Sequence, residues 1–303
     1  LLFKEERTSI IKPLSIESQE GTGSMGDDTA LAVMSKMHRQ IYDYFRQQFA
    51  QVTNPPIDSL REVSVMSLET CYGPELNIFE ETPEHAKRLV TSSPVLSYKK
   101  LQSILCNPYY DCDEIKLEYK RNIDLKTALK NLQRKVIQSV NDGNTIIHLD
   151  ESVPDKDSFH INALLAIGCV HQHLVKLGLR SKVNIVVTSS SARDTHQIAC
   201  LIGFGATAVY PTLAYQTILD LTKRNELQGD AHKNCARYRK GINKGLLKII
   251  SKMGISTISS YRGSQLFEIV GLSDEIVDMC FTNTVSRIQG KNFKNLHYEN
   301  KKL

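Results

Sequence analysis

Apolar residues follow two different patterns in the second half of the chain. Between residues 124 and 143, leucines and valines recur three and four positions apart, which places them on one face of a helix. Three other stretches are short and almost continuously apolar: 144–152, 182–191 and 206–211. Because short apolar runs bounded by polar residues are typical of buried strands, they predict three strands of one sheet.

Stretches of helical length separate and follow these runs. We expect helices at 160–178, 192–205 and 212–227. Strands that alternate with helices form parallel sheets, because each helix carries the chain back across the sheet. The predicted fold class is therefore α/β, a mostly parallel sheet with flanking helices, preceded by a helical N-terminal part.

The first half of the chain has a less regular pattern. Residues 1–24 are mostly polar and predict an extended or loosely packed arm. A helix is expected at 30–50, with Ile41, Tyr44 and Phe45 on its apolar stripe. The prolines of QVTNPPID would end that helix, since proline lacks the N–H that helix propagation needs.

The rest of the chain is assigned by the same criteria. We expect a single strand at 115–119, a helical block at 233–270, a helix followed by a loop at 273–290, and a polar, mobile tail beyond Gly290. The expected domain organisation has three parts: an arm or linker at 1–20, one domain at 21–290, and a polar tail or cut end at 291–303.

Composition narrows the function classes. The 303 residues are 41% hydrophobic and 23% charged, and the formal net charge is +5. Basic and acidic residues are interspersed, so no nucleic-acid partner is predicted. No run of about 18 apolar residues is present, which predicts no membrane-spanning helix. The seven cysteines form no CxxC pair, which favours reduced thiols over a zinc site or disulfides.

The stretch GSMGDDTALAVMS, residues 23–35, could be a metal loop, a phosphate loop or a turn that begins a helix. Adjacent aspartates point apart in most backbones, and neither the calcium-loop nor the Walker spacing is present. The commoner use of these residues is structural: Gly23 and Gly26 would permit a turn, and Asp28 or Thr29 would cap a helix at Ala30.

A second candidate is the serine loop that follows the apolar run at 182–191. Hydroxyls at the carboxyl end of a parallel strand, facing a helix N-terminus, are typical of anion sites in α/β folds. Ser189, Ser190 and Arg193 could therefore hold a phosphate. The alternative is that the serines satisfy donors of the loop and that Arg193 pairs with a neighbouring acid.

No catalytic motif is recognisable from spacing. His171 and His173 are two positions apart, which places them on different faces of a helix and disfavours a metal pair. The chain contains no GxSxG, no HExxH and no paired carboxylates that suggest a catalytic residue. The residues alone predict no catalytic site and no metal.

Several longer blocks resemble one family. GSMGDDTALAVMS, the segment containing QVTNPPIDSLRE, GPELNIFEETPEHAKRL, DTHQIACLIGFGATAVYP and KGLLKIISKMGIST occur in the order seen in the central domain of the large subunit of glutamate synthase. The resemblance extends over residues 21–290. It implies an α/β unit similar to a rudimentary or incomplete flavin-type (βα) barrel.

The resemblance also implies what surrounds such a domain. The parent enzyme, an oxidoreductase, has a glutaminase (amidotransferase) domain that releases ammonia from glutamine. A domain that binds flavin mononucleotide (FMN) then makes glutamate from 2-oxoglutarate and that ammonia, and the enzyme carries an iron–sulfur cluster. The central domain connects the two catalytic domains and lines the ammonia tunnel. The implied location is the cytoplasm, or the plastid stroma in a plastid-bearing source.

The chain lacks the residues that those reactions need, so we expect no cofactor in it and no catalytic role of its own. Mapping the family's tunnel onto matching positions implies Met25, Thr53 and Asn54 as tunnel residues. Two strand ends depart from the family pattern: residues 149–151 and the serine loop at 188–193. Two other functions stay open, a stand-alone α/β scaffold and a phosphate- or flavin-binding domain.

Overall fold

The centre of the molecule is a parallel sheet. The computed structural model describes residues 4–23, 29–48, 61–152 and 154–301. Four strands lie in the order β4-β6-β8-β9, and every neighbouring pair is parallel. Their bounds are β4 (Cys112–Lys116), β6 (Ile146–Asp150), β8 (Asn184–Ser189) and β9 (Ala208–Pro211). The predicted α/β class with a mostly parallel sheet is confirmed.

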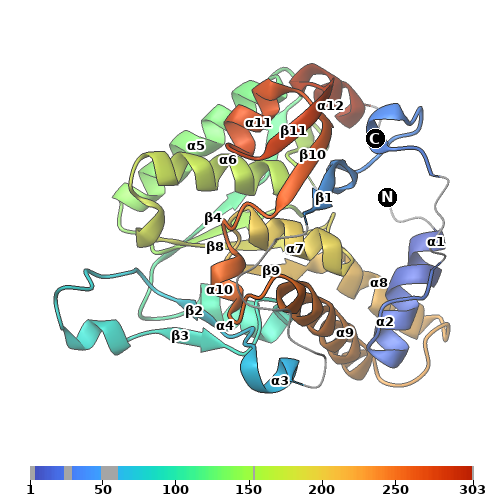
Figure 1. The fold of residues 1–303 in the computed structure, drawn as a ribbon, viewed down its shortest axis with the longest axis horizontal. Coiled ribbons are helices and arrows are strands. Elements are labelled where there is room, and N and C mark those ends of the chain that lie inside the picture. Colours follow the sequence, from blue (N-terminus) through green and yellow to red (C-terminus); the bar gives the residue numbers. More distant parts are fainter. Residues whose placement is uncertain (1–3, 24–28, 49–60, 153, 302–303) are drawn as a thin grey trace.

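Helices join these strands and flank the sheet (Figure 1). Three of them begin at a side-chain cap, in which Asp124, Asn162 or Asp194 accepts a hydrogen bond from a free N–H of the first turn. The helices are α5 (Leu125–Asn141), α6 (Ala163–Lys176), α7 (Thr195–Gly203) and α8 (Thr212–Lys223). Strand–helix alternation in a parallel sheet is the repeating unit of a (βα) barrel, here present over four strands.

The predicted single strand at 115–119 is two strands. The chain bends after β4, and β5 (Glu118–Lys120) pairs antiparallel with β7 (Ser158–His160). Ile115 and Leu117 are both buried in the main core. One sequence run thus contributes to two sheets.

A second sheet replaces three predicted helical or loop regions. Strand β1 (Phe45–Gln47) pairs antiparallel with β10 (Phe267–Leu272), which pairs in parallel with β11 (Val285–Lys291). The predicted helix at 30–50 is wrong: the described part holds two short 3₁₀ turns, η2 (Ala32–Met34) and η3 (Ile41–Tyr44), before β1, and no helix begins at Ala30.

Burial explains these corrections. Ile41, Tyr42, Tyr44 and Phe45 are all buried, so nearly every position of this segment is enclosed, not one stripe of it. In β10, burial alternates along Phe267–Ile269 as expected for a strand, and β11 replaces the expected loop. The rest of the predicted helical block is largely α9 (Ala231–Lys252), with the short α10 (Ile258–Tyr261) after it.

The N-terminal residues are helical, so the expected extended arm is wrong. A short α1 (Lys4–Glu6), a π-helical turn η1 (Arg7–Ile11) and α2 (Lys12–Glu17) form one continuous segment. Ile11 and Leu14 are buried, and the segment lies against α9 (Figure 1). Its two buried apolar residues stand three positions apart, and helix formation puts both on the same face.

The C-terminal residues are also ordered into a helix, which corrects the expected polar tail beyond Gly290. Helix α12 (Phe293–Asn300) begins at a capping box between Asn292 and Asn295. Phe293 and Leu296 are buried, and the Asn300 side chain donates to the carbonyl of His160. The two buried residues and this hydrogen bond hold the otherwise polar segment against the body.

A loop projects from the body between β2 (Thr70–Tyr72) and β3 (Leu89–Thr91), which pair antiparallel. We call residues 73–88 the projecting loop; it includes the 3₁₀ turn η4 (Pro83–Ala86) and extends away from the sheet (Figure 1). The side chains of Ile78 and Phe79 are 81% and 89% exposed. The remaining short elements are α3 (Glu62–Val65), α4 (Tyr98–Leu105), η5 (Arg180–Lys182) and α11 (Asp274–Cys280).

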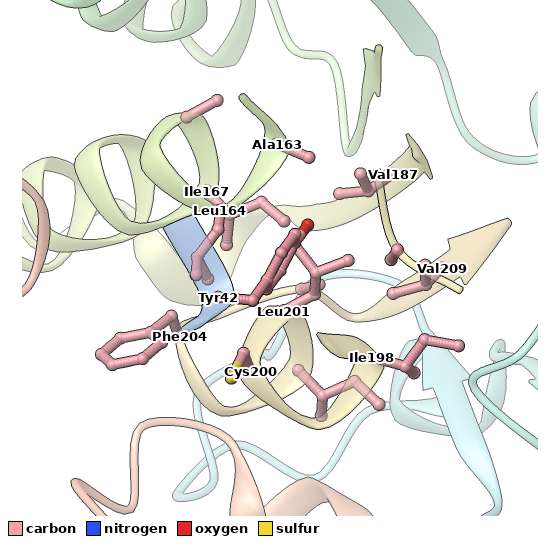
Figure 2. Close-up of a cluster of buried hydrophobic side chains, with 14 of the residues drawn as sticks. Tyr42, Ala163, Leu164, Ile167, Val187, Ile198, Cys200, Leu201, Phe204 and Val209 are labelled. Carbon is pink, nitrogen blue, oxygen red and sulfur yellow. The ribbon is translucent and has the colours of Figure 1, made fainter. Parts of the chain in front are cut away.

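The largest core lies between the sheet and the helices that cover it. Figure 2 shows side chains from α6, α7, β8 and β9 meeting around the ring of Tyr42. Tyr42 comes from η3, far away in sequence, and is fully buried. The N-terminal half of the chain therefore contributes a central side chain to the core of the C-terminal half.

Candidate functional site at the carboxyl ends of the parallel strands

The carboxyl ends of β6 and β8 bring two polar stretches together. Glu151 follows β6, and the serine loop, Ser189 to Ser191, ends β8 and leads to α7. The two strands are neighbours and parallel, so their carboxyl ends lie at the same edge of the sheet. Ligands of open α/β sheets bind at this edge, which makes it the first place to examine.

The Glu151 carboxylate is enclosed by hydrogen-bond donors. Its Oε2 accepts from Ser189 Oγ at 2.8 Å, from the backbone N–H groups of Ser190 and Ser191 at 3.0 Å each, and from Ser191 Oγ at 2.8 Å. Its Oε1 accepts from the N–H of Ala163, the first residue of α6, at 2.9 Å. Glu151 is only 3% exposed. Hydrogen bonds to a charged acceptor are stronger than neutral ones, so this carboxylate ties together two strand ends and a helix N-terminus.

Tyr42 extends this network to the N-terminal half. Its hydroxyl lies 2.9 Å from Ser191 Oγ. The single O–H proton of Ser191 is directed at Glu151, so Tyr42 donates to Ser191. Burial, and then the negative charge of Glu151, raise the pKa of Tyr42 well above its ordinary value, so the phenol keeps the proton that it donates. A chain of donors therefore runs from Tyr42 to Ser191 to Glu151.

Arg193 points to a different partner. Its guanidinium forms an ion pair with Glu6 from the N-terminal helical segment. The backbone of Arg193 is held as well, since its N–H donates to Gln197 Oε1 at 2.7 Å and its carbonyl accepts from the Tyr238 hydroxyl at 2.8 Å. Ser189, Ser190 and Arg193 thus lie within one loop, but the serines contact Glu151 and the guanidinium contacts Glu6.

These contacts determine whether the carboxyl ends of β6 and β8 can bind a phosphate. Of the donors that the anion hypothesis assigned to a phosphate, Ser189 Oγ and the N–H of Ser190 are engaged by Glu151, and the guanidinium of Arg193 is engaged by Glu6. A phosphate at the same place would also lie against that negative charge. The residues present therefore do not fit the phosphate of a flavin, and anion binding by Ser189, Ser190 and Arg193 stays a prediction without added support.

A recess of about 350 Å³ opens beside the start of α7. Thr195, His196, Lys248 and Lys252 are among its lining residues. The Nε2 atom of His196 lies 3.2 Å from the carbonyl oxygen of Tyr42, so both ends of Tyr42 contact the region around α7. The recess combines basic and apolar side chains, and no arrangement of nucleophile and base is apparent among them.

The tunnel residues implied by the resemblance cannot be placed. Met25, Thr53 and Asn54 lie outside the described residues, as do the glycine and aspartates of the GSMGDD turn that follow Gly23. Residues 29–48, which stand between these stretches in the sequence, are described and carry Tyr42. The tunnel therefore stays a prediction.

The described parts of the chain contain no assembled metal site, and Cys200 Sγ lies 3.7 Å from His196 Nε2. No group of three His, Cys, Asp or Glu side chains gathers there. All seven cysteines are free, and Cys169, Cys200 and Cys280 are buried. His171 accepts a hydrogen bond from Arg180 Nε at 3.0 Å, and burial together with the charges of Arg180 and Arg262 lowers its pKa to about 3.

Sequence reasoning missed Glu151, Tyr42 and Glu6. Glu151 could have been found, because it follows a predicted strand whose carboxyl end must lie beside the serine loop. The two strand ends that the resemblance singled out contact each other. No sequence pattern indicated Tyr42 or Glu6 as site residues, because both stand in segments whose predicted structure was wrong.

Comparisons with known proteins identify a family and several relatives that the chain resembles. Residues 2–273 match the family described as the glutamate synthase central domain. The chain is 36% identical over 307 residues to glutamate synthase [NADH] of Saccharomyces cerevisiae, a match that covers 96% of this chain and 14% of that protein. It is 39% identical to the chloroplastic ferredoxin-dependent glutamate synthase 2 of Arabidopsis thaliana over 305 residues, 94% of this chain and 18% of that protein. It is 36% identical to the large chain of glutamate synthase [NADPH] of Bacillus subtilis over 286 residues, a match that covers 94% of this chain and 19% of that protein.

Solved structures similar to this chain are more remote. The flavin-binding domain of baker's yeast flavocytochrome b2 shares 12% sequence identity at a TM-score of 0.39, over 68% of this chain and 44% of that one. Within the described residues, every helix is too short or too polar to span a bilayer. With most of its length matched by one family description and by relatives of that family, the chain belongs to the glutamate synthase central domain family.

Proposed function

We propose that the chain is the non-catalytic connecting domain of a glutamate synthase. In this function it links the glutaminase domain to the FMN-binding domain and lines the passage for ammonia between them. The parent enzyme makes glutamate from glutamine and 2-oxoglutarate. Family membership carries this proposal, together with the small share, 14–19%, that the chain spans of the relatives it matches.

The chemistry of the strand ends supports a non-catalytic role. At the edge where α/β proteins usually bind ligands, Glu151, the serines and Tyr42 satisfy one another. A catalytic carboxylate needs a free lone pair directed at substrate, and Glu151 is enclosed by five donors. This edge of the sheet therefore supports structure and offers no general base.

The parent's cofactors belong to other domains in this proposal. Glu151 takes the donors that a flavin phosphate would need. The described cysteines do not gather as an iron–sulfur cluster requires, since such clusters are held by several converging thiolates. FMN and the cluster would then be bound by the remaining parts of the same polypeptide, and the domains that carry them are the partners of this chain. The cytoplasm or plastid stroma follows from the same proposal.

Ammonia transfer sets requirements that the assigned stretches meet in residue type. Ammonia must travel unprotonated, because the ammonium ion is strongly solvated and cannot attack a carbonyl. Walls of small, apolar and weakly polar side chains suit that passage, and Met25 and Thr53 have that character, with Asn54 beside them. The described segment 29–48, held by Tyr42 at the sheet edge, connects the two stretches.

A single substitution tests the tunnel. Met25→Trp in the full-length enzyme should abolish most glutamine-dependent glutamate formation, because the larger ring fills the passage. Activity with external ammonium salt should stay unchanged. Both rates are measured by glutamate production with the same reductant.

The matched control is Met37→Trp, since Met37 is 76% exposed in the segment that follows. It should leave both activities intact. If Met25→Trp also leaves glutamine-dependent synthesis unchanged, the tunnel assignment fails, whereas loss of both activities would point to a folding defect and not to a blocked passage.

A further inference from the structure

The projecting loop presents two large apolar side chains to solvent. Ile78 and Phe79 are adjacent and are 81% and 89% exposed. Single exposed apolar residues are common on protein surfaces. Here two neighbours stand on an excursion that extends away from the sheet and contributes neither of them to the core (Figure 1). Core packing within the described residues therefore does not explain why these two apolar side chains stand on the loop.

The loop holds these side chains in a fixed turn. Asn77 Oδ1 accepts from the N–H of Phe79 at 3.1 Å, and Asn77 Nδ2 donates to Glu80 Oε1 at 2.9 Å. The carbonyl of Asn77 accepts from the N–H of Glu80, and a ring nitrogen of His85 lies 2.8 Å from the carbonyl oxygen of Glu80. An apolar contact made from an ordered loop loses less conformational entropy on binding than one made from a flexible loop.

The part of the projecting loop next to the two apolar residues is acidic. Between residues 74 and 86 the chain carries Glu75, Glu80, Glu81 and Glu84 and no lysine or arginine. The two basic residues of the loop stand at its end, where Lys87 pairs with Glu84 and Arg88 donates to the carbonyl of Gly73. An acidic rim around an aromatic anchor is complementary to an apolar pocket with basic residues at its edge. Two copies of the same loop would repel each other.

We propose that the projecting loop is a docking element: Phe79 and Ile78 enter an apolar pocket rimmed by lysine or arginine on another part of the same glutamate synthase polypeptide. The inference rests on the proposed function, in which other domains flank this one. The relatives support the choice of occupant, because this chain spans only 14–19% of their length and most of their surface lies elsewhere.

Photo-crosslinking in the purified full-length enzyme tests the proposal. The probe is Phe79→p-benzoylphenylalanine, which keeps an aromatic ring at the docking position. Irradiation followed by peptide mass spectrometry should give one discrete crosslink to a peptide outside the 303 residues, with a lysine or arginine next to apolar residues. Its yield should not depend on protein concentration. The control is the same substitution at Leu219, which is 47% exposed on α8 and should give no discrete product.

Charge reversal gives a second, independent measurement. Glu81→Lys, added to the Phe79 probe, should lower the crosslink yield about fivefold, which corresponds to about 1 kcal/mol at 25 °C. Asp142→Lys, an exposed acid at the end of α5, should leave the yield unchanged.

Three results would overturn the docking element: no discrete product, a crosslink confined to this chain, or one between copies whose yield rises with concentration. The result of the crosslinking test can be distinguished from the result of the tunnel test. A crosslink to another domain together with an ineffective Met25→Trp would uphold docking and remove the tunnel role, and the reverse pair of results would do the opposite.

Discussion

The Tyr42 hydroxyl is one of the side-chain contacts that join the two halves of the chain. It donates to Ser191, which donates to Glu151, and all three side chains lie at one edge of the sheet. Ser191 can still donate to Glu151 when Tyr42 is changed, but its hydroxyl then loses the donor that Tyr42 supplied. A buried polar group that loses its partner costs about 1–3 kcal/mol.

Tyr42→Phe should therefore lower the free energy of unfolding by about 1–2 kcal/mol, because it removes the hydroxyl and leaves the ring packed. Urea unfolding followed by circular dichroism measures the change. Tyr109→Phe is the matched control, since Tyr109 is exposed, and it should alter stability by less than about 0.5 kcal/mol. Equal values for the two variants would contradict the donor chain.

His171 predicts a dependence of stability on pH. Its pKa is lowered to about 3, first by burial and then by Arg180 and Arg262, from the ordinary 6.5 of the unfolded chain. Between about pH 3 and pH 6.5, His171 therefore binds a proton in the unfolded chain but not in the folded chain. The free energy of unfolding consequently falls as the pH falls below about 6.5. At pH 5 the loss from this one residue is about 2 kcal/mol.

His171→Asn removes the titration while keeping an acceptor for Arg180. Relative to the wild type, the variant should lose about 2 kcal/mol less stability between pH 7 and pH 5. Urea titrations at both pH values provide the comparison. An unchanged difference between the two pH values would show that His171 is protonated in the folded chain.

At the scale of residues, the sequence predicted the serine loop of the candidate site but not the carboxylate that the loop contacts. The serine loop was identified because hydroxyls at the carboxyl end of a strand are a local feature. The partner of those hydroxyls was not identified, since Glu151 stands 38 to 40 positions away and only the paired strands bring it close. An external anion and an internal carboxylate satisfy the same donors, so local sequence could not distinguish them.

At the scale of elements, periodicity predicted the strands and helices that alternate and failed where burial is continuous. The helix at 125–141 and the strands β6, β8 and β9 agree with their predicted stretches. The segment 41–45 was misassigned because its apolar residues, Ile41, Tyr42, Tyr44 and Phe45, are all buried and so do not form a single stripe. Spacing identifies an element only when one face is exposed to solvent.

Close approach of elements sets a sharp limit on side-chain size. A Cβ at Gly168 in α6 would lie 2.3 Å from the backbone oxygen of Cys280, at the end of α11, and 2.9 Å from the ring of Phe281. A backbone oxygen cannot rotate away, so α6 and α11 would have to separate.

Gly168→Ala should accordingly destabilise the chain by about 1–3 kcal/mol, the usual cost of overpacking, although alanine favours helix by about 1 kcal/mol over glycine. Thermal unfolding measures the difference. Val175→Ala, at an exposed position of the same helix, is the control and should change stability by less than about 0.5 kcal/mol. A stabilised Gly168→Ala variant would mean that the two helices do not approach this closely.

At the scale of the whole molecule, the fold class and the family could be predicted from the sequence, and the second sheet could not. Alternating strands and helices dictate a parallel arrangement by local connection. The sheet β1-β10-β11 unites segments from opposite ends of the chain, and no short-range pattern encodes that pairing. The N-terminal helical segment on α9 was missed for the same reason.

The pairing of β1 with β10 has a consequence for how the chain matures. On the ribosome, Phe45 leaves the exit tunnel while its cross-strand neighbour Ile269 is still about 200 residues from being translated. Until then the newborn chain keeps a run of aromatic and aliphatic groups without their final neighbours, and nascent-chain chaperones have reason to shield it. Completion of the late strand is what ends that dependence.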